Sequence, residues 1–184
     1  TAKNNAIYSF NDKCYISISN STVTATSTDN RSIFIEEDGE ETITISNSTV
    51  TVTGSNCAVY APKVEVTGNS VVEMKATITD TPDDDYCALG GCGDNFIVAE
   101  TLEVLASTEV DGSNPVPYVK ADRVKYDWVK IAAPAPTLYD VWVAGTQVTS
   151  ANAADVLGDG AASYDAATNT LTVSKNITAT GTTQ

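Results

Sequence analysis

The feature that most constrains the fold of this chain is an internal repeat of two short motifs. Residues 16–26 (ISISNSTVTAT) recur as residues 43–53 (ITISNSTVTVT), an offset of 27 positions. Weaker copies begin at Val64, Leu102 and Val124. A shorter motif precedes each copy, at residues 6–10, 32–36, 58–62, 96–100 and 118–122. Two motifs that keep one order through five copies are typical of a solenoid, in which each repeat packs on its neighbours.

Apolar and polar residues alternate within both motifs, which is the periodicity of a β-strand. The second motif predicts two faces of a coil, and Asn20 and Asn47 stand at the bend between them, where a left-handed backbone is needed. The shorter motif predicts another buried face, made of Ile7, Ile33, Val59, Ile97 and Val119. Three strands per coil predict an all-β fold, a right-handed parallel β-helix of about five coils. A β-sandwich of short strands is the alternative.

Two stretches interrupt the repeat and suggest domain boundaries. Residues 76–95 lengthen the spacing between the third and fourth copies, and we expect them to form a surface loop. Residues 132–136 (AAPAP) predict a stiff linker. The expected organisation is a parallel β-helix over residues 1–131, the linker, and a small β-rich segment over residues 137–184. That last segment is a hairpin cap or the start of a further repeat.

Charge and residue content argue against several classes of function. The 184 residues include 24 acidic and 10 basic side chains and no histidine, so the formal net charge is −14. Nucleic-acid binding is not expected, because it depends on Lys and Arg that neutralise phosphates. Without histidine no Ser-His-Asp or Cys-His unit can form, and the only arginines are Arg31 and Arg123, so we expect no enzymatic activity. No run of 18 apolar residues occurs, so no membrane insertion is expected.

The C-terminal part carries a resemblance to a known group of proteins. Residues 138–160 (LYDVWVAGTQVTSANAADVLGDG), followed by residues 163–173 (SYDAATNTLTV), resemble the module start of large repetitive bacterial cell-surface proteins. The ITISNSTVTV coils are similar to the β-helical, carbohydrate-binding-type domains of that group. The resemblance implies an extracellular, cell-surface location and a monomeric segment of a longer repetitive chain. Its implied partners are polysaccharides or glycoproteins.

An aromatic ladder is the main candidate binding site. Tyr8, Phe34 and Tyr60 occupy the same outward-facing position in the first three copies. Aromatic faces stack on the apolar faces of sugar rings, so a ladder at coil spacing predicts binding of an extended polymer. The alternative is that the stacked rings only stabilise the sheet.

Two further clusters are candidates for a metal site and a disulfide. Calcium takes carboxylate oxygens, which are available at Asp83, Asp84, Asp85 and Asp94. Such a charge run is equally typical of a solvated loop, and no other cofactor is expected. Cys87 and Cys92 are close in sequence and are the disulfide candidate for an oxidising compartment. A zinc site of four thiolates is the competing interpretation, although CxxC spacing is absent.

Together these patterns predict a non-catalytic extracellular surface protein that binds polysaccharide or host glycans through the solenoid face. The alternative is a purely structural stalk, which spaces the other domains of a large surface adhesin. The two hypotheses differ in whether the aromatic ladder contacts a ligand.

Overall fold

The computed structural model describes residues 1–10, 13–36, 41–78 and 83–178. The chain divides into two compact units, Thr1–Pro134 and Ala135–Gln184. In the described residues, strands provide nearly all of the regular structure, apart from one short 3-10 helix, η1 (Lys120–Lys125). The prediction of an all-β chain is therefore confirmed. The boundary between the units falls within the Ala/Pro stretch of residues 132–136.

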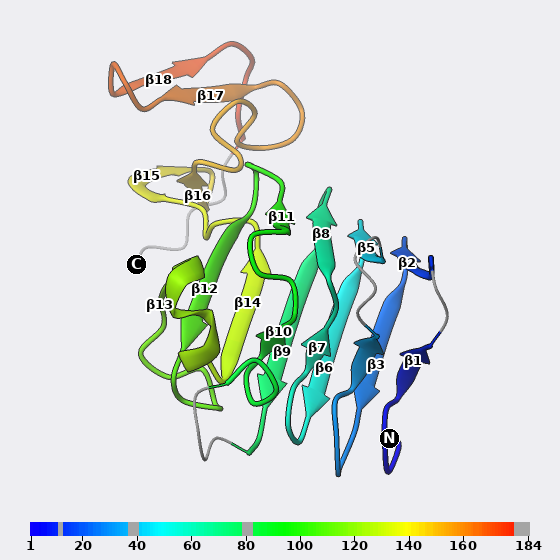
Figure 1. Cartoon of the computed structure of the whole chain (residues 1–184). Coiled ribbons are helices and arrows are strands. Elements are labelled where there is room, and N and C mark those ends of the chain that lie inside the picture. Colours follow the sequence, from blue (N-terminus) through cyan, green and yellow to red (C-terminus); the bar gives the residue numbers. More distant parts are fainter. Residues whose placement is uncertain (11–12, 37–40, 79–82, 179–184) are drawn as a thin grey trace. The chain divides into compact units, whose positions relative to one another are not determined.

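In its described residues the first unit contains three sheets, and the chain visits them in turn (Figure 1). We call one passage of the chain through the three sheets a coil. The first sheet contains β1 (Ile7–Ser9), β4 (Ile33–Ile35), β7 (Val59–Tyr60) and β10 (Leu89–Gly90). The second sheet contains β2 (Tyr15–Ser19), β5 (Thr42–Ser46), β8 (Lys63–Thr67) and β11 (Phe96–Val98). The third sheet begins with β3 (Thr22–Thr26), β6 (Thr49–Gly54) and β9 (Val71–Ala76). All pairings among these strands are parallel.

The sequence repeat sets the register of these sheets. Equivalent positions of successive copies pair directly, so that Ile16 lies opposite Ile43 and Ile43 lies opposite Val64. In the third sheet Val23 pairs with Val50 in the same way. The inward side chains of the middle coil are almost completely buried, and Ile43 is fully buried. The β-branched residues of each strand thus form the core by stacking on the same residue type in the next coil.

The bends between the second and third sheets use residues with a left-handed backbone. Asn20 has φ 48° and Asn47 has φ 47°, as the sequence predicts, and Gly68 takes the equivalent place with φ 64°. The Asn47 side chain supports the next bend, because its Oδ1 accepts a hydrogen bond from the Asn69 backbone N–H at 3.1 Å. A side chain at Gly68 would collide with that oxygen, since a Cβ would lie 2.2 Å from it.

The predicted stack of five residues in the first sheet is wrong beyond the third coil. Leu89, not Ile97, pairs with Val59 and is buried. Ile97 belongs to β11 in the second sheet and is 46% exposed, and Val119 is 48% exposed. The inward side chains of β11 are Phe96 and Val98, which flank Ile97. Phe96 pairs with Val64 and is buried, and Val98 packs against the core. Residues 79–82 of the expected loop lie outside the described residues, but the described part of residues 76–95 is not simply a surface loop, since it contributes β10 to the core.

The third sheet changes direction after β9. Strand β14 (Trp128–Ala132) pairs antiparallel with β9, and β12 (Glu103–Ser107) and β13 (Val116–Pro117) follow, also antiparallel. The Trp128 indole N–H donates to Glu73 Oε1 at 2.8 Å, which ties β14 to β9. Asp127 directly precedes β14. Burial, the larger cause, and the nearby Glu109 carboxylate, the smaller one, raise the pKa of its carboxyl to about 6. A fifth coil, predicted from the motif at residues 118–122, is replaced by η1 and this antiparallel edge.

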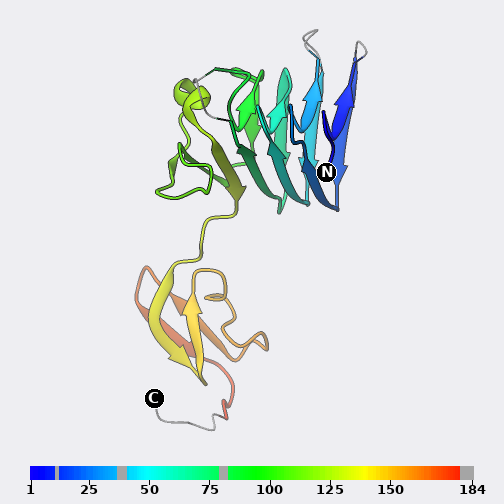
Figure 2. The same ribbon diagram turned by 90° about the horizontal axis from the view of Figure 1, so that it is seen from below.

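In its described residues the second unit contains two antiparallel hairpins (Figure 2). It also has a core of its own. The first pairs β15 (Leu138–Val143) with β16 (Thr146–Thr149), and the second pairs β17 (Ala162–Asp165) with β18 (Thr170–Val173). Their shared core contains Val143, Val148, Val156 and Ala162.

Candidate functional site

The aromatic ladder lies on the outward side of the first sheet. Strand pairing places Tyr8 opposite Phe34 and Phe34 opposite Tyr60. The Tyr8 and Phe34 rings are stacked, with centroids 5.3 Å apart and planes inclined by 13°. The Phe34 and Tyr60 rings meet edge to face at 5.6 Å. Tyr8 is 48% exposed, and the other two rings are half-buried. We call these three side chains the aromatic strip.

Phe10 extends the aromatic strip at its open end. It lies two residues after Tyr8, on the same side of the chain, and its ring centroid is 6.1 Å from that of Tyr8. With 67% exposure it is the most accessible large apolar side chain in the described residues. Partial desolvation and then the Glu36 carboxylate raise the pKa of Tyr8, so its phenol stays a neutral hydrogen-bond donor. The alternation of Tyr8, Ser9 and Phe10 would have identified Phe10 from the sequence.

Arg31 covers the other end of the aromatic strip. Its Cζ lies 4.6 Å from the Phe34 centroid and 4.5 Å from the Tyr60 centroid. The guanidinium is held in place by an ion pair with Asp85. Such a cation over aromatic faces is attracted by the ring quadrupole, so Arg31 fixes both rings in position. Phe34 and Tyr60 are therefore partly shielded, whereas Tyr8 is open.

Two glycines allow Tyr60 to lie against strand β10. A Cβ at Gly90 would approach the Tyr60 ring to 2.9 Å, and one at Gly91 would approach it equally closely. Any side chain here would displace the ring. Gly90 pairs with Tyr60, so the fourth coil has a glycine at the position where a fourth ring would lie.

The aspartates proposed as calcium ligands point to different partners. Both Asp84 carboxylate oxygens accept hydrogen bonds from Arg123 at 2.6 Å, and Asp85 pairs with Arg31. Asp83 Oδ1 accepts a hydrogen bond from the Asp85 backbone N–H at 3.4 Å. Within the described ranges, no group of three or more Asp, Glu, Cys or His side chains is arranged to hold a metal ion. Asp84 and Asp85 instead attach residues 83–85 to the sheet and to η1.

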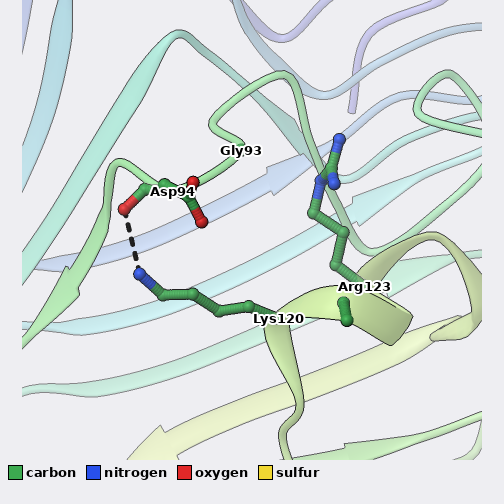
Figure 3. A pocket seen from close by; sticks show the side chains of 5 residues that line it. Gly93, Asp94, Lys120 and Arg123 are labelled. Atoms are coloured by element: carbon green, nitrogen blue, oxygen red, sulfur yellow. Dashed lines mark hydrogen bonds between the residues drawn. The ribbon is translucent and has the colours of Figure 1, made fainter.

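A pocket of about 340 Å³ lies beside this cluster, lined by Gly93, Asp94, Lys120, Ala121 and Arg123 (Figure 3). The Lys120 ammonium donates to the Asp94 backbone carbonyl at 2.9 Å, while the Arg123 side chain runs in a different direction (Figure 3). Partial desolvation lowers the pKa of Arg123, but the Asp84 carboxylate outweighs it and the pKa is raised overall. Both cations already have partners within the chain.

The structure places the disulfide candidates in the core as free thiols. Cys87 and Cys92 are both buried, as is Cys57, and Cys14 is half-buried. The Cys87 thiol donates a hydrogen bond to the Asp84 carbonyl at 3.4 Å, and the Cys57 thiol donates one to the Val59 carbonyl at 3.1 Å. Desolvation raises the pKa of Cys92 to about 11, against the opposing influence of the Arg123 charge.

Comparisons with known proteins leave the function to be inferred from these residues. No protein-family model matches the chain, and no curated protein and no solved structure matches it either. Among the described residues, no helix is long and apolar enough to cross a membrane.

Proposed function

We propose that this chain is a non-catalytic extracellular surface protein that binds neutral polysaccharide or glycan chains along the aromatic strip. We further propose that the three sheets are the faces of a right-handed parallel β-helix, with three complete coils and a partial fourth. The proposal rests above all on the in-register stack of Tyr8 on Phe34, which leaves Tyr8 exposed on the outer side of the first sheet.

The geometry of the aromatic strip suits an extended ligand. Its rings repeat at the spacing of parallel strands, so it runs for about 10 Å along the sheet and offers stacking area for about two sugar rings. Arg31 holds Phe34 and Tyr60 in place before any ligand arrives, which reduces the conformational entropy lost on binding. So small a contact gives weak affinity, and useful binding would depend on several copies acting together.

The charge of the chain favours a neutral ligand. A formal charge of −14 repels polyanionic glycans, and Arg31 is already paired with Asp85. Neutral polymers are not repelled, and they bind through C–H contacts with aromatic faces and hydrogen bonds from groups such as the neutral Tyr8 phenol.

A structural spacer is the second candidate function, and the partial shielding of the strip favours it. Phe34 and Tyr60 are half-buried beneath Arg31, as expected of rings that stabilise neighbouring strands. In that case the coils would separate other domains without contacting a ligand.

Affinity electrophoresis through gels that contain neutral polysaccharides separates the two candidates. We expect at least one polymer to retard the wild-type chain, and we expect Tyr8→Ala/Phe34→Ala/Tyr60→Ala to migrate as in an empty gel. Tyr15→Ala is the matched control, because Tyr15 is 66% exposed on the second sheet, outside the strip. Thermal unfolding of each variant checks that the sheet persists. Equal retardation of the triple variant would contradict binding through the aromatic strip, and no retardation by any polymer would support the spacer.

A further inference from the structure

Cys57 and Cys87 occupy equivalent positions on neighbouring coils of the first sheet. Val59 pairs with Leu89, and each cysteine lies two residues before one of this pair. The backbone pairing continues toward them, because the Val59 N–H donates to the Ala88 carbonyl at 3.2 Å. Parallel strands lie about 4.8 Å apart. That spacing is within the Cα separation of about 4.4–6.8 Å that a disulfide spans.

Both side chains also point to the same side. Side chains alternate along an extended chain, so each cysteine faces the same way as the apolar residue two positions later. Cys57 and Cys87 are 0% exposed, and Val59 and Leu89 are each 1% exposed. Each thiol donates a hydrogen bond to a backbone carbonyl, Cys57 to Val59 at 3.1 Å and Cys87 to Asp84 at 3.4 Å, and the Cys57 thiol is close enough to raise the pKa of Cys87.

We propose that Cys57 and Cys87 are a redox pair that closes to a disulfide between the third and fourth coils when a low-molecular-weight disulfide is the oxidant. The thiolate of one cysteine attacks that oxidant, forms a mixed disulfide and releases one small thiol. The second cysteine then attacks the mixed disulfide, forms the S–S bond and releases the other small thiol. Two protons and two electrons pass from the protein to the oxidant, which is reduced to two thiols. This proposal does not rest on the proposed function.

Burial decides when the bond can form. The attacking species is a thiolate, and the neighbouring Cys57 thiol and desolvation raise the pKa of Cys87 in the folded chain. The folded, reduced protein should therefore react slowly with a small disulfide. The same cysteines are accessible while the chain is folding, so the bond should form readily during refolding and then be protected from reductant.

The bond would anchor the segment that fixes the aromatic strip. Residues 83–85 lie between the two cysteines in sequence, and Asp85 holds Arg31 while Asp84 holds Arg123. Closing a loop of about 30 residues lowers the entropy of the unfolded chain, which we expect to raise Tm by about 10 °C relative to the reduced form.

Refolding in a buffer of reduced and oxidised glutathione tests the pair. The refolded chain is alkylated in denaturant with N-ethylmaleimide and mapped by mass spectrometry without reduction. We expect one linked peptide that joins Cys57 to Cys87, two alkylated thiols at Cys14 and Cys92, and a Tm that falls when dithiothreitol is added to the unfolded chain before refolding. Cys92→Ala is the matched control, since it removes another buried thiol and should leave the link intact.

The proposal is overturned by alkylation of all four thiols after oxidative refolding, or by a link from Cys87 to Cys92. Cys57→Ala should abolish the link and leave Cys87 alkylated. Because the wild-type chain is compared with its own reduced form, the conclusion does not depend on whether that variant folds.

Discussion

Replacing Ile43 by alanine tests the stacked core directly. Ile43 is fully buried in the middle coil, between Ile16 on one side and Val64 on the other. The substitution removes three carbon atoms, worth about 2.4 kcal/mol at about 0.8 kcal/mol each. The cavity left between two fixed neighbours adds to this loss, so we expect Ile43→Ala to lower the free energy of unfolding by about 3–4 kcal/mol.

Ile16 provides the comparison, because it fills the same position in the first coil. It is half-buried and pairs with Ile43 on one side only among the described strands. We expect Ile16→Ala to cost about 1–2 kcal/mol, since less of its surface is removed from water. Ser17→Ala, at an exposed position of the same strand, should cost less than about 0.5 kcal/mol.

Equilibrium unfolding in urea, followed by circular dichroism, measures all three variants. The reasoning requires the order Ile43→Ala, Ile16→Ala, Ser17→Ala from the largest cost to the smallest. If the terminal substitution costs as much as the central one, the stacking of successive coils does not determine the stability of the core.

Three further predictions concern single side chains. Asp127 has a pKa near 6 when folded, above its unfolded value. The protonated carboxyl therefore stabilises the fold fully below about pH 4, and this stabilisation is lost as the pH rises through 6. Asp127→Asn should flatten the pH dependence of the urea midpoint between these values. At pH 7 it should raise the free energy of unfolding by about 1 kcal/mol, because no charge is then buried. Gly68→Ala should cost about 2–3 kcal/mol in the same assay, because strain at φ 64° adds to the collision with Asn47, whereas Gly93→Ala, with positive φ but open space, should cost about 1 kcal/mol. Arg31→Ala should cost about 1–2 kcal/mol through loss of its ring contacts, and the near-ultraviolet circular dichroism of the tyrosines should change with it.

The first three coils were predictable because the repeat leaves their register no freedom. Residues 16–26 and 43–53 are nearly identical, so any stacking that buries one buries the other on the same face. A slip by one residue would turn every isoleucine outward, which is why the alternation also fixes the aromatic strip on the outer side.

The fourth coil was not predictable from alternation. Strand β10 has only two residues, Leu89–Gly90, which are too few to show a period, and they follow an aspartate-rich stretch that resembles a loop. The pattern around Ile97 predicts a first-sheet strand with Ile97 inward, whereas the strand belongs to the second sheet and turns Phe96 inward. A repeated Cys-Ala pair, at Cys57 and Cys87, precedes Val59 and Leu89 and would have predicted that these two residues pair.

Contacts between distant residues lay beyond what the repeat could predict. Arg31 and Asp85 are 54 positions apart, and no motif links them. The antiparallel direction of β14 could not be predicted from the sequence either, because an alternating pattern is the same in both strand directions.

Binding of a neutral polymer by the aromatic strip is most directly tested by NMR titration of the chain with neutral oligosaccharides of increasing length. We predict that the ring resonances of Tyr8, Phe34 and Tyr60 shift together as ligand is added, and that the shift grows from a monosaccharide to a trisaccharide. The ring pair Tyr139 and Tyr164, whose centroids are 5.0 Å apart in the second unit, serves as an internal control and should not respond. Shifts confined to that pair, or no shift in the rings of the aromatic strip with any neutral oligosaccharide, would contradict the proposal.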